Sequence, residues 1–122
     1  MACLETTFLI DLLRGKAVVQ ELKDELDRTE RYLCVATPSI MELWSGALRA
    51  KHQETEQEKI QELIQSLDIL SFDEKSAKIA AEIELELSQK GLPIQPEDVM
   101  IASIAKANGE KLVTHDAHYS RI

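Results

Sequence analysis

Four short apolar segments, separated by longer segments with helical periodicity, are the feature that most constrains the fold of this chain. The apolar segments have the length and composition of strands, and they lie at residues 2–5, 31–37, 68–72 and 111–114. None of them is joined to the next by a two-residue hairpin turn. Because strands separated by helices pair in parallel, the sequence predicts an α/β fold with a parallel β-sheet flanked by helices.

The segments between the strands carry helix start and stop signals. We expect helices at residues 8–15, 17–30, 38–53, 58–67, 73–90 and 96–109. In the second of these, Val18, Leu22 and Leu26 recur at helical spacing, so we expect that face to pack. Thr37 is the expected N-cap of the third helix, with Pro38 at its first position. The last helix has an almost wholly apolar body, which predicts burial at the centre of the domain.

Length and composition narrow the class of protein. With 122 residues and 44% hydrophobic content, the chain is expected to form one domain spanning residues 1–122. It shows neither a membrane-spanning run nor a secretion signal, so we expect no membrane association and a cytoplasmic location. The net charge of −8 argues against a generally basic surface for nucleic acid. Cys3 and Cys34 lie in strand-like runs without zinc-site spacing, and we expect buried free thiols.

Four acidic residues are expected at one edge of the sheet. Glu5 ends the first strand and Asp116 follows the fourth, while Glu42 and Asp98 lie near the starts of helices. In open parallel sheets, ligands bind beyond the carboxyl ends of the strands, where the following helices begin. Any one of these acids alone is explained as a solvated carboxylate or a favourable charge near a helix N-terminus. Together they predict a site, because carboxylates held close to one another need a compensating cation.

The ligand types predict which cation this would be. Several carboxylates, with no cysteine or histidine among them, suit the hard cations Mg²⁺ and Mn²⁺ better than zinc or copper. A cation in such a site can activate water and stabilise charge on a phosphodiester, which is the pattern of metal-assisted nucleases. For phosphate contacts we consider a basic rim, whose candidates are Arg14, Arg49, Lys51, Lys106 and Lys111.

Three segments, LETTFLIDLLRG, TPSIMELWSGA and PEDVMIASIAKANGEKLVTHDAHY, together resemble the PIN domain, and specifically the VapC-type toxins of prokaryotic toxin–antitoxin pairs. Thr7 fits the hydroxyl position of the first family motif, Glu42 fits the second, Asp98 the third and Asp116 the fourth. At position 5 the family pattern has aspartate and this chain has glutamate.

The resemblance implies a three-layer α/β/α fold and an Mg²⁺- or Mn²⁺-dependent endoribonuclease acting on single-stranded RNA. It implies that Glu5, Glu42, Asp98 and Asp116 bind metal and orient the attacking water, with Thr7 as a positioning residue. It also implies a VapB-type antitoxin as partner, and a homodimer formed partly through the first two helices and the helix carrying Trp44.

Two other functions stay open from the sequence. Glu5, one methylene longer than the family's aspartate, favours a non-catalytic PIN-like module that binds a protein partner or RNA. A phosphatase or phosphoacceptor domain is disfavoured, because the chain has no evident strand-end aspartate nucleophile with a paired lysine. We expect Asp11 at a solvent-facing helical position and His115 in an exposed loop, neither with an assigned role.

Overall fold

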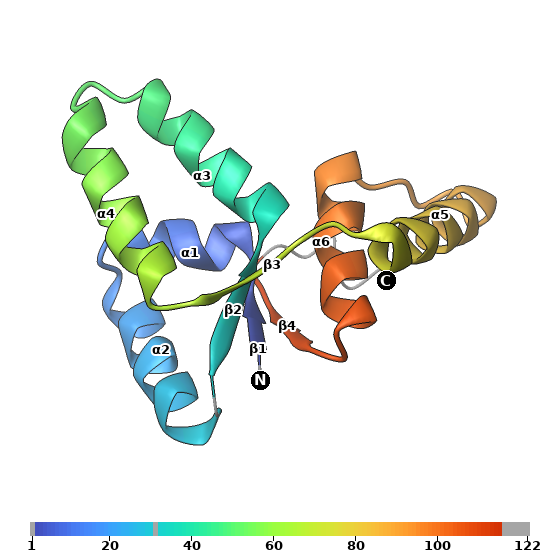
Figure 1. Cartoon of the computed structure of the whole chain (residues 1–122), viewed down its shortest axis with the longest axis horizontal. Helices are drawn as coiled ribbons and strands as arrows, with labels where there is room; N and C mark the ends of the chain where they lie inside the picture. The colour runs from blue at the N-terminus through green and yellow to red at the C-terminus, as the bar shows by residue number, and fades with distance from the viewer. Residues whose placement is uncertain (1, 31, 116–122) are drawn as a thin grey trace.

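The computed structural model describes residues 2–30 and 32–115. Within this part of the chain, four strands form one sheet in the order β3-β2-β1-β4, and every neighbouring pair is parallel (Figure 1). The strands are β1 (Ala2–Leu4), β2 (Leu33–Ala36), β3 (Asp68–Leu70) and β4 (Lys111–Val113). The prediction of a parallel sheet with helices between its strands is confirmed.

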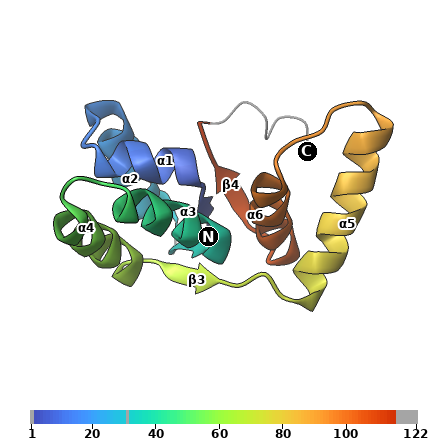
Figure 2. The same ribbon diagram turned by 90° about the horizontal axis from the view of Figure 1, so that it is seen from above.

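The helices cover both faces of this sheet. They are α1 (Thr6–Leu13), α2 (Ala17–Thr29), α3 (Thr37–Leu48), α4 (Gln53–Gln65), α5 (Glu74–Gln89) and α6 (Pro96–Ala107). Figure 2 shows α1 to α4 on one side of the sheet and α6 on the other, with α5 outside α6. The arrangement is therefore the expected three-layer α/β/α. None of the described helices combines the length and apolar character that crossing a bilayer requires.

The two faces of the strands belong to different hydrophobic cores. Ala2 and Leu4 of β1 contact the core beneath α1 to α4, whereas Cys3 lies on the opposite face with α6, as expected from alternation along a strand. Cys34 is the register partner of Cys3 in the neighbouring strand. Both thiols are free and fully buried, which confirms the prediction. The hydrogen bond with Cys34, together with burial, raises the pKa of the Cys3 thiol.

Helix α6 lies at the centre of the second layer, as its apolar sequence predicts. Its Ile101 and Ile104 are fully buried against the sheet. On its other side, Val99 packs with Ile83 and Leu87 of α5. Helix α5 thus packs against the outer side of α6. This packing fixes the start of α6, where Asp98 lies.

The packing face of α2 differs from the prediction. Val18 and Leu22 are 69% and 44% exposed, whereas Val19 is 3% exposed and lies in the core. The inward face is shifted by one residue, and it places Lys23 and Glu30 at the helix edge, where each makes an ion pair. Leu26, the third residue of the predicted stripe, does pack against this core, so the prediction is confirmed for Leu26 and wrong for Val18 and Leu22.

Helix boundaries also differ from the prediction, most of all where α3 ends at Leu48 and α4 begins at Gln53, each five residues earlier than expected. Helix α3 begins at Thr37 with Ala36 as its N-cap, and no side chain caps it, so the prediction of Thr37 as the cap was wrong. Pro38 then occupies the second helical position, where its missing N–H costs nothing because the first four N–H groups have no intrahelical partner. Helix α1 begins two residues before the predicted start, because the Glu5 side chain accepts a hydrogen bond from the Thr7 N–H and caps it.

Candidate functional site

The carboxyl ends of β1 and β2 bring two helix starts to the same edge of the sheet. Helix α1 follows β1 with Glu5 as its N-cap, and α3 follows β2 with Glu42 in its second turn. Because β1 and β2 are parallel neighbours, both acids lie at this edge. Asp98 is in the first turn of α6. Asp116, the fourth predicted acid, lies outside the described residues.

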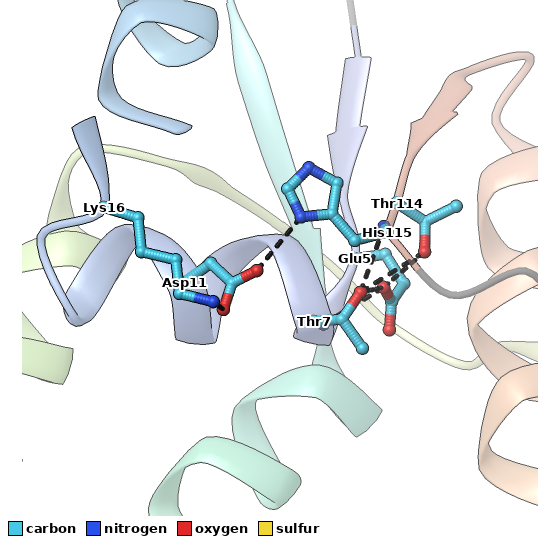
Figure 3. A network of polar contacts seen from close by, with 6 residues as sticks. All are labelled: Glu5, Thr7, Asp11, Lys16, Thr114 and His115. Carbon is cyan, nitrogen blue, oxygen red and sulfur yellow. Dashed lines mark hydrogen bonds and ion pairs between the residues drawn. The ribbon is translucent and has the colours of Figure 1, made fainter. Parts of the chain in front are cut away.

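Glu5 is a buried carboxylate held by three hydrogen bonds. It is 1% exposed, and glutamate is rarely so buried without partners. Its Oε1 accepts hydrogen bonds from the Thr7 N–H (3.0 Å), the Thr7 hydroxyl (2.5 Å) and the Thr114 hydroxyl (2.5 Å) (Figure 3). All three bonds end on Oε1. None of them uses Oε2, the other carboxylate oxygen of Glu5.

Glu42 is held differently, and its charge is less well compensated. Its Oε1 accepts a hydrogen bond from the Thr6 hydroxyl at 2.9 Å. Burial raises the pKa of the Glu42 carboxyl; the bond from Thr6 acts in the opposite direction, and the negative charges of Asp98 and Glu5 raise it further. Glu42 therefore shares an electrostatic environment with both other described acids of the predicted set.

The adjacent threonines at the start of α1 each donate a hydrogen bond to one acid, Thr6 to Glu42 and Thr7 to Glu5. The Thr6 Oγ1 lies 2.9 Å from Glu42 and 3.0 Å from the Ser39 hydroxyl. A hydroxyl has one proton, so when Thr6 donates it to the carboxylate, Ser39 donates to Thr6. Thr7 donates to Glu5 and accepts from the His115 backbone N–H at 3.1 Å. The Thr-Thr pair thus connects α3 on one side with the end of β4 on the other.

Asp11 is not the solvent-facing residue that the sequence predicted. Its side chain is 18% exposed and lies 3.0 Å from both the Lys16 ammonium and the His115 Nδ1 (Figure 3). These hydrogen bonds, that with His115 first, lower the pKa of the Asp11 carboxyl. The His115 ring also packs edge-on against Phe8, with ring centroids 5.4 Å apart. His115 is partly exposed, as predicted, but its ring is fixed by two contacts from α1.

The donor set of this edge suits a hard divalent cation. The predicted ligands Glu5, Glu42 and Asp98 offer only carboxylate oxygens, and the mutual repulsion that raises the pKa of Glu42 is what a bound cation would relieve. In residues 2–30 and 32–115, however, no three acidic, histidine or cysteine side chains lie close enough together to enclose a metal ion. The chemistry of the donors fits, and the described residues do not by themselves form a closed ligand set.

A groove leads away from Glu42 between α1, α3 and α4. Its volume is about 570 Å³, and it is lined by Glu42, by apolar side chains that include Leu43 and Ile60, and by basic residues that include Arg14 and Lys51. These two cations belong to the predicted basic rim. The groove therefore joins the acidic edge to a positively charged and partly apolar surface.

Sequence reasoning missed three residues that organise this site: Thr6, Ser39 and Thr114. Ser39 is fully buried and Thr6 is 4% exposed. A signal was present for Thr6, because buried hydroxyls need a partner and it directly follows a strand-end acid. No local signal marked Thr114, whose partner Glu5 is 109 positions away in the chain.

Comparison with known proteins adds to this geometry. A family model described as PIN domain matches residues 2–122. Ribonuclease VapC3 of Methanocaldococcus jannaschii is 36% identical over 104 residues, which cover 84% of this chain and 96% of that protein. The tRNA(fMet)-specific endonuclease VapC of Shigella flexneri is 26% identical over 113 residues, covering 93% of this chain and 84% of that protein.

A solved structure shows the same fold. The crystal structure of VapBC2 from Rickettsia felis, bound to a DNA fragment from their promoter, matches with a TM-score of 0.91 and 27% identity, over 99% of this chain and 92% of that chain. The family match covers nearly the whole sequence, and a relative above 30% identity is matched over almost its full length. The chain belongs to the PIN domain family, among its VapC-type ribonucleases.

Proposed function

We propose that this protein is a divalent-metal-dependent endoribonuclease of the VapC toxin type that cleaves single-stranded RNA. The observation that carries the proposal is the shared environment of Glu42, Glu5 and Asp98 at the carboxyl edge of the sheet, where burial and like charge raise the pKa of Glu42. Carboxylates gathered in this way are typical of a site completed by a cation. The names of the relatives, ribonuclease and endonuclease, support RNA as the substrate.

Mg²⁺ or Mn²⁺ is the proposed cofactor, with Glu5, Glu42, Asp98 and Asp116 as its ligands. When bound, the cation would lower the pKa of a water molecule and neutralise charge developing on the phosphodiester. The preference for these two metals follows from an all-oxygen donor set.

The protein's own part in the reaction is to hold the acids in a fixed orientation. The Thr7 hydroxyl and backbone N–H hold Oε1 of Glu5, which leaves Oε2 as the oxygen that would bind the cation. The Thr6 hydroxyl favours the ionised form of Glu42, which is the form that attracts a cation. Because hydrogen bonds fix both carboxylates in advance, little reorganisation is needed when substrate arrives.

The substitution Asp98→Asn tests the proposal. We expect loss of metal-dependent cleavage of a single-stranded RNA, with an unchanged circular dichroism spectrum and no loss of thermal stability in metal-free buffer, because like-charge repulsion is relieved. Asp24→Asn is the matched control, since Asp24 is exposed on α2 and contacts Gln20. Cleavage by Asp98→Asn at the wild-type rate would remove Asp98 from the mechanism.

A VapB-type antitoxin is the proposed protein partner. The support is the similarity to the structure of VapBC2 from Rickettsia felis. We also propose a homodimer formed partly through α1, α2 and α3, where Val18, Leu22 and Met41 are exposed. Light scattering at micromolar concentration would contradict this if it gave the mass of one chain. The two buried thiols and the RNA substrate support a cytoplasmic location.

One observation favours a second function. Oε1 of Glu5 is saturated by donors from the protein itself, and the described residues contain no closed ligand set. A non-catalytic PIN-like module that binds a protein or RNA would need no more than this. Titration with Mn²⁺ separates the two: binding at micromolar to low millimolar metal that Asp98→Asn abolishes supports the nuclease, and no binding supports the module.

A further inference from the structure

Within residues 2–30 and 32–115, β4 is a short strand at the edge of the sheet, and an important side chain follows it. It has three residues, pairs with β1, and is only partly buried. Immediately after it, the Thr114 hydroxyl donates to Oε1 of Glu5. Because three residues of edge pairing fix a strand weakly, the position of this hydroxyl depends on what else holds β4 in place.

Two side-chain contacts to helices hold β4, an ion pair at one end and a hydrogen bond at the other. At its start, Lys111 pairs with Glu30, the residue that ends α2. Just beyond its other end, Asp11 of α1 contacts the His115 ring at 3.0 Å. In the register of the sheet, Lys111 lies beside Ala2, far from the site, whereas Val113 lies beside Leu4, next to Glu5. The two pairs can therefore be compared as a distant and a near attachment of the same strand.

The near attachment consists of two hydrogen bonds from His115 to one face of α1. Thr7 and Asp11 are four residues apart in α1, so their side chains lie on the same face. Thr7 accepts the His115 backbone N–H at 3.1 Å, and Asp11 accepts from the ring. Since a carboxylate can only accept, Nδ1 carries the proton in this contact. Helix α1 thus binds both the backbone and the ring of His115. This fixes the direction of the chain at the end of β4.

We propose that Asp11 and His115 are positioning residues of the ribonuclease: they fix the end of β4 so that the Thr114 hydroxyl stays on Glu5 and keeps that carboxylate oriented. The proposal rests on the proposed function for its effect on cleavage. Neither residue touches the reacting atoms in this account. Their contribution is made through Thr114 and Thr7, whose hydroxyls share Oε1 of Glu5.

The first test needs no metal and no activity. Amide hydrogen exchange is measured by NMR on the metal-free full chain for the His115 N–H, bonded to Thr7, and the Glu5 N–H, bonded to the Val113 carbonyl. Asp11→Ala should speed exchange at both amides several-fold. Lys16→Met removes the other partner of Asp11 and should leave both rates unchanged. Glu30→Gln, at the distant attachment, should leave the His115 rate unchanged. Wild-type exchange in Asp11→Ala would overturn the proposal.

The second test measures the consequence for the site. For Asp11→Ala we expect kcat to fall by about 10-fold or more, the size typical of residues that orient metal ligands, with KM for RNA unchanged and weaker Mn²⁺ binding by calorimetry. Asp11→Asn should recover part of both losses, because its amide oxygen still accepts the Nδ1 proton. If exchange speeds up in Asp11→Ala while kcat and Mn²⁺ affinity stay at wild type, the contact is structural only and the positioning role is wrong.

The outcomes separate this proposal from the proposed function. If the wild-type protein cleaves no RNA, the nuclease proposal fails, and the Mn²⁺ affinities of the two Asp11 variants still decide whether this pair orients Glu5. If the wild-type protein cleaves RNA and Asp11→Ala retains both full kcat and full Mn²⁺ affinity, the nuclease stands and the positioning role falls.

Discussion

The carboxylates on the two sides of the candidate site, Glu5 and Glu42, have opposite surroundings. On the β4 side, Glu5 is almost fully buried and has three donors on one oxygen. On the α3 side, Glu42 has the Thr6 hydroxyl and faces the charges of Asp98 and Glu5. Glu5 is held in place by donors of the fold itself, whereas the ionised form of Glu42 is disfavoured by its surroundings.

This difference indicates a division of roles within one site. A carboxylate surrounded by donors keeps one orientation with or without a ligand. A carboxylate in a field of like charge gains most when a cation arrives, because the cation removes the repulsion. The Glu5 side is therefore the prearranged part of the site, and the Glu42 side is the part whose energy depends on metal.

The substitution Glu42→Gln should give the largest effect and tests this division directly. We expect cleavage to fall on the order of 100-fold or more, as when one preorganised group is removed from a catalytic site. In metal-free buffer the same variant should melt at a higher temperature than wild type, because it loses a destabilising charge. The measurements are single-stranded RNA cleavage and thermal melting. A variant that is both less active and less stable would show that Glu42 is structural.

Changes at Glu5 should have smaller effects that depend on the metal. If Glu5 is a ligand in a site shaped for aspartate, Glu5→Asp should raise cleavage and tighten Mg²⁺ binding, and Glu5→Gln should do the opposite. Mg²⁺ tolerates little distortion of its ligands, so wild type should prefer Mn²⁺ more strongly than Glu5→Asp does. Cleavage is compared under each metal, with a chelator control. Equal activity and equal metal preference in wild type and Glu5→Asp would exclude Glu5 as a ligand.

The smallest effect is on the pH dependence of stability. The pKa of Glu42 is raised in the folded protein above its ordinary value of 4.5. The folded state therefore holds this proton more tightly than the unfolded state, and stability falls as pH rises through the folded pKa. In metal-free buffer, wild type should lose stability relative to Glu42→Gln as the pH rises above the ordinary value of 4.5. A constant difference, measured by denaturant unfolding as the pH rises, would contradict the raised pKa.

Much of the fold was predictable because its signals are local. The absence of hairpin turns indicated parallel pairing, and the apolar body of α6 indicated burial, which Ile101 and Ile104 confirm at 0% exposed. Aspartate is a common N-cap residue, and Asp73 accepts the Ser76 N–H at the start of α5. The placement of Glu5 and Glu42 at one edge followed from parallel strands alone.

The parts that failed depend on partners distant in the chain. The inward face of α2 is decided by Val19 and by the pairing of Glu30 with Lys111, which no periodicity within α2 reveals. The contact between Asp11 and His115 joins residues 104 positions apart. Such contacts are set by the strand order β3-β2-β1-β4, and four short apolar strands do not encode their own order.

The packing of α5, the outermost helix, has a consequence for local unfolding of the protein. Ala80, Ile83 and Leu87 of α5 form a small core with Val99 of α6 that is separate from the two cores on the sheet. Elements with their own small core tend to open as cooperative units below the free energy of global unfolding. Helix α5 is therefore expected to detach first under mild denaturant, and in doing so it would uncover the outer side of α6, the helix that carries Asp98, while the hydroxyl contacts of Glu5 remain closed.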